Sequence, residues 1–464
     1  MAEQSEDGHG PAGAVGAMAG SEQGEPASIR KVAFASAVGA TIEWYDFFIY
    51  GTAAGLVLNQ LFFPPGNPTA ATLAAYATFA VGFFARPIGG VVFGHYGDRL
   101  GRKAMLVLTI LIMGVGTFLI GLLPTYESIG IWAPILLVAL RILQGIGLGG
   151  EWGGAVLMAV EHAPPDKRGW YGSWPQMGVP AGLLLGTLMF TALSALPDEQ
   201  FLAWGWRIAF LSSAVLLVVG TYIRVKISET PAFAKVKEAH SEPKVPIADL
   251  IRTQPRHVLL ACGARIADGV SFNIWGVFSI AYATTQLGLP RTTILTAVSV
   301  AAAVMFVMIG VWGAMSDRWG RRPVMGTGAA AFALFALPGF LLVNTGEPLW
   351  ITVALVVAFG LIHPALYTVM APFFSELFEA RYRYTGVSFT YQFPSIFASG
   401  LTPLIATALL AAAGGAPWYF VAYAATCGLI SLICIVLLPE TRGRDIMPAG
   451  EVSAPASRPV DATT

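Results

Sequence analysis

Charged residues inside long apolar segments are the first candidates for chemistry in this sequence. Glu43 and Asp46 fall in one such segment, and Arg141 and Glu151 fall in another. An ionisable group is costly to bury in a membrane, so each one is a functional hypothesis. A carboxyl group beside a guanidinium stays ionised, and it can take up a proton when the guanidinium is drawn away. This chemistry predicts proton coupling, with Asp46 as carrier, Arg141 as its partner, and Glu43 and Glu151 as second choices.

Helical spacing places these residues on common faces. Glu43, Asp46 and Tyr50 follow one another at i, i+3 and i+7, and Arg141 and Gln144 begin a similar stripe in the other segment. Further polar and aromatic residues within apolar segments are predicted to line a substrate cavity between helices. The predicted lining comprises Tyr50, Arg86, Gln144, Gln176, Arg265, Asp268, Asn273, Trp275, His363 and Gln392.

Several of these residues have structural alternatives that the sequence leaves open. Arg86 precedes Pro87, so its guanidinium could bind backbone carbonyls that the proline frees instead of an anionic substrate. Arg265 and Asp268 lie three residues apart, and a private ion pair on one helix is the favoured interpretation. For His363, the only histidine within a predicted span, a hydrogen-bonded core role is favoured over proton transfer.

The elements that position these residues are predicted to be membrane-spanning helices. Of the 464 residues, 55% are hydrophobic and 12% are charged, and the mean hydropathy is +0.66. Soluble globular domains carry about 25% charged residues. A helix needs about 20 apolar residues to cross the hydrocarbon core, and open strands cannot satisfy their backbone there. The segments that meet this rule are 31–58, 71–95, 104–123, 131–161, 172–195, 204–225, 256–286, 291–315, 322–343, 348–377, 386–413 and 416–438.

Composition also excludes several classes of function. The 27 basic and 27 acidic residues balance, which excludes a generally basic nucleic-acid-binding protein. Cys262, Cys427 and Cys434 lie in apolar runs without metal-ligand spacing, so no metal site is predicted. The sequence contains no HExxH or GxSxG motif, and its glycine run over 145–150 does not indicate a nucleotide site, because no strand precedes it and it lies within a predicted span. The sequence therefore predicts neither an enzyme nor a cofactor.

The predicted helices fall into two sets of six. The expected organisation is a disordered tail over 1–29, a six-helix bundle over 30–225, a cytoplasmic loop over 226–255, a second bundle over 256–439 and a disordered tail over 440–464. The first residues lack the basic and apolar regions of a signal peptide. Most basic residues fall on one side of the spans, so the positive-inside rule predicts a multi-pass plasma-membrane protein with both termini in the cytoplasm.

A repeated motif indicates that the two bundles are copies of one unit. GHYGDRLGRK at Gly94–Lys103 and GAMSDRWGRR at Gly313–Arg322 share Gly, Asp, Arg, Gly and Arg at the same positions. Repeated halves place a substrate site at the midplane and rock about it. We expect ion pairs between the halves to close the cytoplasmic face, as exposed pairs worth about 0–1 kcal/mol each. The predicted gate comprises Asp98, Arg99, Arg102, Glu161, Arg168, Asp317, Arg318, Arg321, Glu376 and Arg383.

The same motifs resemble the signature of the major facilitator superfamily, and the resemblance covers roughly residues 30–445. Four segments are similar to the metabolite:proton symporter family, namely EWYDFFIYG (Glu43–Gly51), ARPIGG (Ala85–Gly90), RILQGIGLGGEWGG (Arg141–Gly154) and SETPAF (Ser228–Phe233). PETRG (Pro439–Gly443) resembles a motif of the related sugar porters. The resemblance implies an all-α membrane protein with twelve transmembrane helices in two pseudo-symmetric bundles. It also supports Asp46 and Arg141 as the proton-coupling residues.

The combined interpretation is a secondary transporter that takes up a small polar or anionic metabolite together with a proton. The family resemblance implies carboxylates such as α-ketoglutarate, citrate and shikimate, or the zwitterions proline and betaine. The arginines favour carboxylates, whereas Trp44, Tyr45 and Trp275 could cage a quaternary ammonium group. The expected partners are this solute, the proton and the lipid bilayer, and the chain is expected to be a monomer. An efflux antiporter of amphipathic compounds and a transport-dead nutrient sensor are the alternatives.

Overall fold

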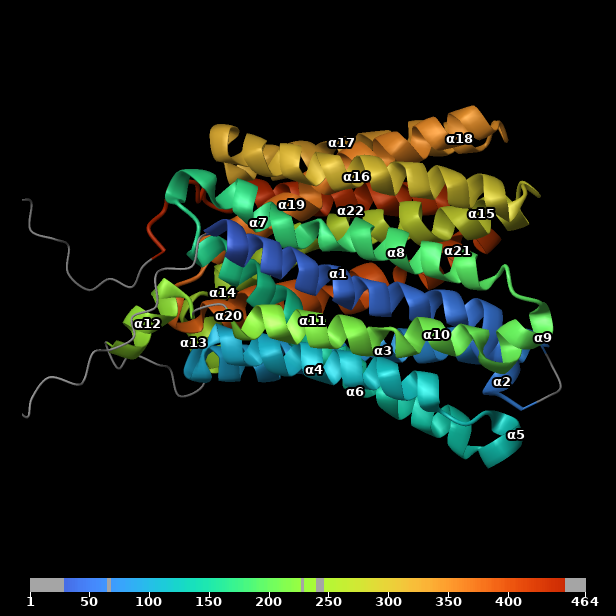
Figure 1. Cartoon of the computed structure of the whole chain (residues 1–464). Coiled ribbons are helices and arrows are strands. Elements are labelled where there is room, and N and C mark those ends of the chain that lie inside the picture. Colours follow the sequence, from blue (N-terminus) through green and yellow to red (C-terminus); the bar gives the residue numbers. More distant parts are fainter. Residues whose placement is uncertain (1–28, 65–67, 227–228, 239–245, 447–464) are drawn as a thin grey trace, which may run out of the picture.

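The computed structural model describes residues 29–64, 68–226, 229–238 and 246–446, and every regular element in these ranges is a helix. The long helices lie side by side with their axes roughly aligned, and the chain runs back and forth along the bundle (Figure 1). Those of the first half are α1 (Ile29–Ala53) continued by η1 (Ala54–Leu58) and α2 (Asn59–Leu61), α3 (Pro68–Leu100), α4 (Arg102–Leu122), α6 (Trp132–Glu161), α7 (Arg168–Gln176) with α8 (Gly178–Leu193), and α10 (Trp206–Leu211) with α11 (Ser213–Val225).

The second half repeats this order. Its long helices are α14 (Pro255–Asn273) continued by η4 (Ile274–Phe278) and α15 (Ser279–Thr285), α16 (Arg291–Trp319), α17 (Arg321–Val343), α18 (Pro348–Leu355) with η5 (Val356–Ile362) and α19 (His363–Leu377), α20 (Arg383–Ser395) with η7 (Ile396–Gly400) and α21 (Thr402–Ala412), and α22 (Trp418–Leu437). Short connecting helices are α5 (Tyr126–Ile129), η2 (Pro165–Lys167), α9 (Asp198–Gln200), η3 (Phe201–Gly205), α12 (Pro231–Glu238), α13 (Pro246–Thr253) and η6 (Ala380–Tyr382).

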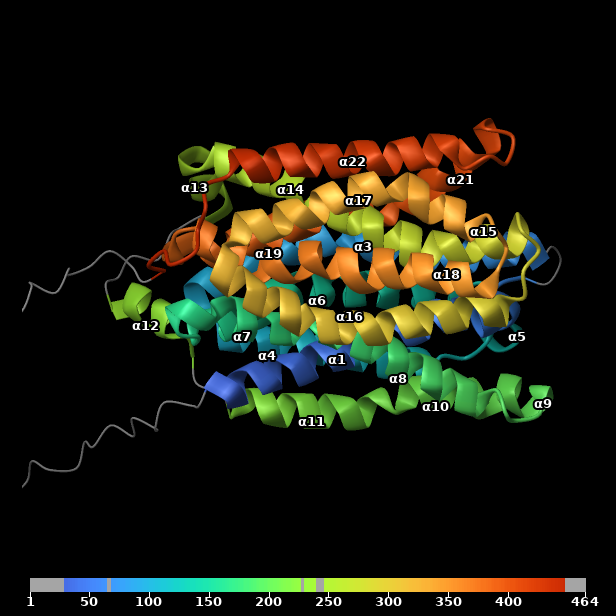
Figure 2. The ribbon, with the colours of Figure 1, turned by 90° about the horizontal axis from the view of Figure 1, so that it is seen from above.

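The predicted twelve spans are confirmed. Within the described residues, 11 helices are long and apolar enough to cross a membrane. The remaining predicted span is α3, a helix of 33 residues that packs along α6 and carries the charged residues Arg86, Asp98 and Arg99. Viewed from above, α17 and α22 of the second half lie on one side, and α1 and α11 of the first half lie on the other (Figure 2). The result is two helical bundles that meet along their length.

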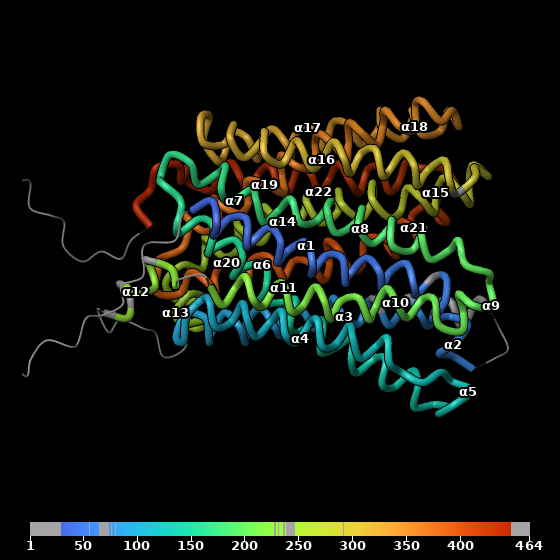
Figure 3. The backbone as a smooth tube through the Cα atoms, in the orientation of Figure 1, coloured from blue at the N-terminus to red at the C-terminus, as the bar shows by residue number. Residues whose placement is uncertain are grey.

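The repeated motif folds in the same way in both halves. Gly101 and Gly320 separate the paired helices and adopt φ values of 115° and 104°, a conformation that favours glycine. A glutamate from the end of each half then caps the following helix. Glu229 accepts a hydrogen bond from the backbone N–H of Lys103 at 3.2 Å, and Glu440 accepts one from that of Arg321 at 2.9 Å. The chain therefore makes a sharp, capped turn at equivalent points (Figure 3).

Two features of the connecting segments differ from the prediction. The loop over 226–255 contains the helices α12 and α13, which lie at the end of the bundle where α3 meets α4 (Figure 1). Residues 440–446, expected to belong to a disordered tail, are instead packed against that end, because Thr441 and Ile446 are buried. The predicted disorder of 1–28 and 447–464 lies outside the described residues.

Candidate functional site

A small cavity lies between the two halves and has about 30 Å³ of room for water-sized molecules. Five of the predicted lining residues contribute to its wall, namely Arg86, Arg265, Asp268, Asn273 and His363. Apart from Trp44, sequence reasoning missed the rest of the wall, which comprises the apolar and aromatic residues Phe47, Phe83, Val179, Phe272, Tyr367 and Tyr391 and the polar residue Ser399. A buried water needs about 10–15 Å³ of such volume, so this cavity is contracted to the size of a few waters.

Arg86 brings a positive charge into this cavity, and Glu43 is the acidic group that interacts with it from beyond ion-pair distance. The Arg86 side chain is 5% exposed, and its guanidinium carbon lies 4.2 Å from the ring centre of Phe83 and 5.0 Å from that of Phe47. Among the described residues, Arg86 makes no ion pair and no hydrogen bond, and it binds no backbone carbonyl near Pro87. Its guanidinium donors therefore remain available to a ligand in the cavity.

The charges on the second half are paired with each other. Arg265 and Asp268 form an ion pair of 2.5 Å on α14, which confirms the favoured interpretation of their spacing. Asp268 Oδ1 also lies 3.5 Å from Nδ1 of His363. The Arg265 guanidinium covers the ring of Tyr391 at 4.2 Å, and the His363 ring stacks on Tyr367. This group lines the cavity wall opposite Arg86 without adding a net charge from its ion pair.

Asp46 and Arg141 are connected through two other side chains. Arg141 Nη1 donates to Oε1 of Gln144 at 2.9 Å, and Gln144 Nε2 donates to Oγ1 of Thr117 at 2.7 Å. Thr117 in turn donates to Oδ2 of Asp46 at 2.8 Å. The guanidinium of Arg141 covers the ring of Tyr50 at 3.9 Å. The predicted partners are thus linked by a continuous hydrogen-bonded chain within the first half, and Thr117 was not foreseen.

This chain reaches the cavity through a second, smaller space. That space has about 10 Å³ of room and is lined by Arg86, Phe83, Arg141 and Gln144 among others. Arg86 and Phe83 also line the larger cavity, so the two spaces share a wall. Asp46 lines neither space. The hydrogen-bonded path from the smaller space to Asp46 runs through Arg141, Gln144 and Thr117.

Glu151 has a partner that the sequence analysis did not identify. Arg224 of α11 donates through both terminal nitrogens to the Glu151 carboxylate, and Thr109 donates to the same carboxylate at 2.5 Å. Gly39 makes room for this contact, because a side chain at that position would overlap the Arg224 guanidinium. Glu43 is buried beside Glu151 and interacts with it. Both second-choice carboxylates therefore belong to one buried cluster.

Three predicted cavity residues lie elsewhere. Trp275 stacks on Phe340 with ring centres 4.7 Å apart and is 1% exposed, because its large apolar ring fills the core of the second half. Gln176 donates to the carbonyl oxygen of Tyr367 at 2.8 Å, and Gln392 donates to that of Gly149 at 3.2 Å. The two glutamines tie the halves together, since an amide buried at a helix interface requires partners.

Tyr50 is also displaced from the predicted cavity wall. Its ring lies beneath Arg141, and its hydroxyl group hydrogen-bonds with Oγ1 of Thr78 at 2.5 Å. The side chain is fully buried within the first half. Gln144, by contrast, lines the smaller space beside the cavity, although not the larger cavity itself.

At the end of the bundle that carries the repeated motifs, each half caps a helix of the other. Asp98 accepts hydrogen bonds from the backbone N–H groups of Tyr384 and Thr385 at 3.0 and 2.9 Å. Asp317 accepts equivalent bonds from Gly169 and Trp170 at 2.7 and 2.8 Å. The donating amides lie in the first turns of α20 and α7, where a carboxylate interacts favourably with the helix dipole.

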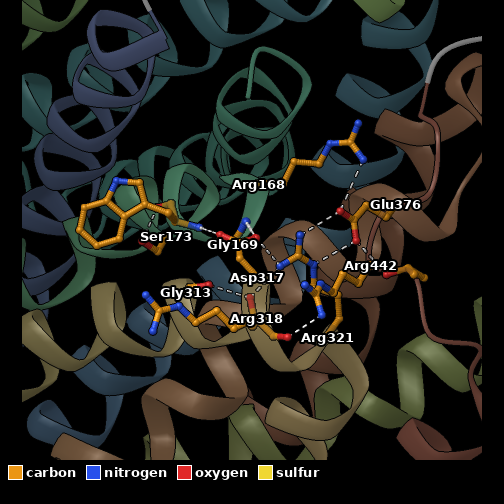
Figure 4. Close-up of polar contacts among 12 residues, drawn as sticks. Arg168, Gly169, Ser173, Gly313, Asp317, Arg318, Arg321, Glu376 and Arg442 are labelled. Atoms are coloured by element: carbon orange, nitrogen blue, oxygen red, sulfur yellow. Dashed lines mark hydrogen bonds and ion pairs between the residues drawn. The ribbon is translucent and has the colours of Figure 1, made fainter. Parts of the chain in front are cut away.

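Ion pairs join the halves beside these caps. Arg383 donates to Glu161 at 2.9 Å, and Arg168 lies 3.6 Å from Glu376. Figure 4 shows the second group, in which Arg321 lies between Asp317 and Glu376 with contacts of 2.7 and 3.1 Å. We use the name gate cluster for eight charged residues of both groups, of which Asp317 is half-buried and the others are buried. They are Asp98, Arg102, Glu161, Arg168, Asp317, Arg321, Glu376 and Arg383.

The predicted gate needs two corrections. Its pairs were expected to be exposed, but the side chains of Arg102 and Arg321 are fully buried, because the two halves close over them. Breaking a buried pair costs about 3–5 kcal/mol, far more than breaking an exposed one. Arg99 and Arg318 do not belong to the cluster. Arg99 is exposed and contacts His95, and Arg318 contributes its backbone carbonyl to Arg442 (Figure 4).

Comparisons with known proteins agree with this architecture. The sequence profile described as Sugar (and other) transporter matches residues 32–258, and the profile described as Major Facilitator Superfamily matches residues 260–459. The chain is 44% identical over 426 residues to the inner membrane metabolite transport protein YhjE of Escherichia coli (strain K12), a match that covers 90% of this chain and 96% of the relative.

Two other relatives carry names that state their solutes. The chain is 40% identical to the shikimate transporter of Escherichia coli (strain K12), with 89% of this chain and 95% of the relative covered. It is 35% identical to the proline/betaine transporter of the same strain, with 90% and 85% covered. Among solved structures, the proton:xylose symporter XylE bound to 6-bromo-6-deoxy-D-glucose matches with a TM-score of 0.72 at 16% identity, over 90% of this chain and 97% of that one. The similarity to this solved structure concerns the fold alone.

Proposed function

The chain belongs to the major facilitator superfamily of membrane transporters, and from this premise we propose that it takes up a small carboxylate together with a proton. We further propose that it acts as a monomer in the plasma membrane, with the gate cluster and both termini on the cytoplasmic side. The positive-inside rule supports this orientation, because most basic residues lie at that end of the helices.

The proposed substrate class rests on the position of the Arg86 guanidinium, which is buried in the cavity wall. A buried guanidinium without a carboxylate is costly unless something supplies the missing charge. A substrate carboxylate in the cavity would do so, and it can accept two parallel hydrogen bonds from one guanidinium. Among the described residues, Arg86 is the charged cavity residue that makes no ion pair within 4 Å, although the buried Glu43 carboxylate attracts it from farther away. The solutes named for the shikimate and proline/betaine relatives both contain a carboxylate.

The three aromatic residues expected to form a quaternary ammonium cage do not surround one point. A cage for such a cation needs several aromatic faces around one point. Of the three candidates, Trp44 lines the cavity, Trp275 is buried in the second half, and the Tyr45 hydroxyl group contacts Ser212 at 2.8 Å. The cage of these three residues is therefore not assembled. The carboxylate assignment rests on Arg86, since the aromatic side chains that do line the cavity can contact an apolar, hydroxylated or quaternary ammonium body alike.

Asp46 is the proposed proton carrier. Its Oδ1 atom has no hydrogen-bond partner among the described residues, whereas Oδ2 receives the Thr117 hydrogen bond. A proton on Oδ1 would remove a buried negative charge. A substrate carboxylate bound at Arg86 changes the charge next to Arg141 in the adjoining space, and the chain through Gln144 and Thr117 relays that change to Asp46. This relay links cargo binding to proton binding.

The test is uptake by purified protein in proteoliposomes, with a panel of hydroxycarboxylates and betaines. We expect a carboxylate to accumulate when the outside is made acidic, and Asp46→Asn to abolish accumulation. Arg86→Met should raise the apparent KM by about 10- to 100-fold, the loss of a charged hydrogen bond of about 1.5–3 kcal/mol, while Arg99→Met on the same helix should not. Accumulation driven in the opposite direction would establish the efflux antiporter. Full accumulation by Asp46→Asn would refute its role.

A further inference from the structure

The segment that follows α22 crosses the gate cluster. Gly443 adopts a φ of 78°, and the N–H of Arg444 donates to the carbonyl of Thr441 at 3.0 Å, so the chain turns at this point. A glycine is suited to this turn because it tolerates positive φ. The turn directs the next residues over the end of the bundle. Ile446 is 2% exposed there, although it lies near the end of the chain.

Backbone carbonyls of this segment bind arginines from both halves. Arg168 of α7 donates to the carbonyl of Arg444 at 2.6 Å, and Arg383 of α20 donates to the carbonyl of Ile446 at 2.8 Å. Arg383 uses its other terminal nitrogen for Glu161 of the opposite half. A guanidinium presents five donors in a fixed plane, and carboxylates alone do not satisfy them when it is buried. The segment supplies the missing acceptors.

A third contact ties the segment to the second half. The hydroxyl group of Thr441 donates to Oε2 of Glu376 at 2.9 Å, and Thr441 is fully buried. Glu376 is also the carboxylate that Arg168 approaches from the first half. Residues 441–446 therefore contact members of both ion-pair groups, in addition to the cap that Glu440 gives to α17.

We propose that residues 441–446 form a strap that holds this end of the transporter closed and must detach before the cavity opens toward it. The two acceptor carbonyls belong to Arg444 and Ile446, two residues apart, and such a stretch spans at most about 7 Å. Opening moves α7 and α20 apart, since they belong to different halves. The strap cannot follow both Arg168 and Arg383, so one of its bonds must break in every transport cycle.

Truncation tests the strap without requiring a substrate. The reporter is Ser173→Cys, a fully buried position beside Gly313 of the other half, in a background whose three native cysteines are serine. The rate of labelling by a water-soluble maleimide reports opening of this end. Deletion of residues 442–464 should increase the rate about tenfold or more, in line with the loss of one or two hydrogen bonds to charged groups. Deletion of residues 447–464 is the matched control and should leave the rate unchanged.

Full-length variants separate the strap from a general loss of structure. Arg444→Ala keeps the acceptor carbonyl and should label like the parent, whereas Ile446→Ser removes the buried side chain and should label several-fold faster. Thermal unfolding of each variant verifies that it is folded. Equal labelling by the two truncated proteins, whether slow or fast, would overturn the proposal, as would parental labelling by Ile446→Ser. These outcomes are independent of the proposed solute and of proton coupling, because no cargo is present.

Discussion

Removing one charge from the interface between the halves should open this end of the protein. Asp98 accepts two backbone N–H groups, from Tyr384 at 3.0 Å and Thr385 at 2.9 Å, and lies 3.7 Å from Arg102. Asp98→Asn preserves the size of the side chain but leaves one neutral oxygen to accept from two amides. The variant therefore weakens a contact that exists only while the two halves are together at this end.

The magnitude follows from the number and type of bonds lost. A hydrogen bond to a charged group contributes about 1.5–3 kcal/mol and a neutral one about 0.5–1.5 kcal/mol. Replacing two charged bonds by one neutral bond costs the closed state about 2–4 kcal/mol. This cost corresponds to roughly a 30- to 1000-fold shift toward the open state, at 1.36 kcal/mol for each factor of ten. Asp317→Asn should have a similar effect, because it makes the equivalent contact on α7.

The assay is maleimide labelling of Ser173→Cys, as for the strap. The labelling rate of Asp98→Asn should rise by at least tenfold, and spin-label distances across this end should shift toward the longer population. Arg99→Ala is the matched control, since Arg99 is adjacent on α3 but exposed and outside the cluster. An Asp98→Asn rate within threefold of the parent would refute the reasoning that this cap stabilises closure.

Two further substitutions test buried contacts of the first half. Gly39→Ala should lower the thermal unfolding temperature by several degrees, because the added methyl group overlaps the Arg224 guanidinium and a disrupted buried pair costs about 3–5 kcal/mol. Gly326→Ala is the control, because its methyl group meets only ordinary contacts at 3.7 Å. Equal stability of the two variants would contradict the prediction. Thr117→Val keeps the shape of the side chain but removes the hydrogen-bond donor to Asp46. Proton-driven accumulation of the solute should therefore fall at least tenfold, while counterflow exchange of the solute persists. Unchanged accumulation would exclude the relay through Thr117.

The helical spans and the repeat follow directly from the sequence, because both are local signals. Apolar length predicts each span, and Gly101 and Gly320 mark equivalent turns through residue type and position. Charge inside a span singled out Arg86, Arg265 and Asp268, which line the cavity in the structure. Such residues cannot face lipid at low cost, so they point toward the interior of the bundle or toward a cavity.

The partners of those residues were harder to predict, because pairing depends on the rotation of each helix about its axis. Trp275 lies two residues after Asn273, and this spacing turns its ring away from the cavity and into the core. Arg224 lies at the end of a predicted span, where a basic residue needs no special partner, yet the small Gly39 lets it reach Glu151. A single sequence contains no signal that specifies such contacts between distant helices.

The gate cluster and the cavity differ in how far the repeat between the two halves is preserved, and the different contacts that they make explain the difference. In the gate cluster, Asp98 and Asp317 make matching contacts, and so do Arg102 and Arg321 with their glutamates, since closing two rigid halves requires the same contact on both sides of the axis. The cavity is asymmetric. The position equivalent to Arg86 on α16 is the buried apolar residue Met305, and a single small ligand between the halves can neutralise only one such charge. Symmetry is retained where the halves bind each other and lost at the cavity proposed to bind the cargo.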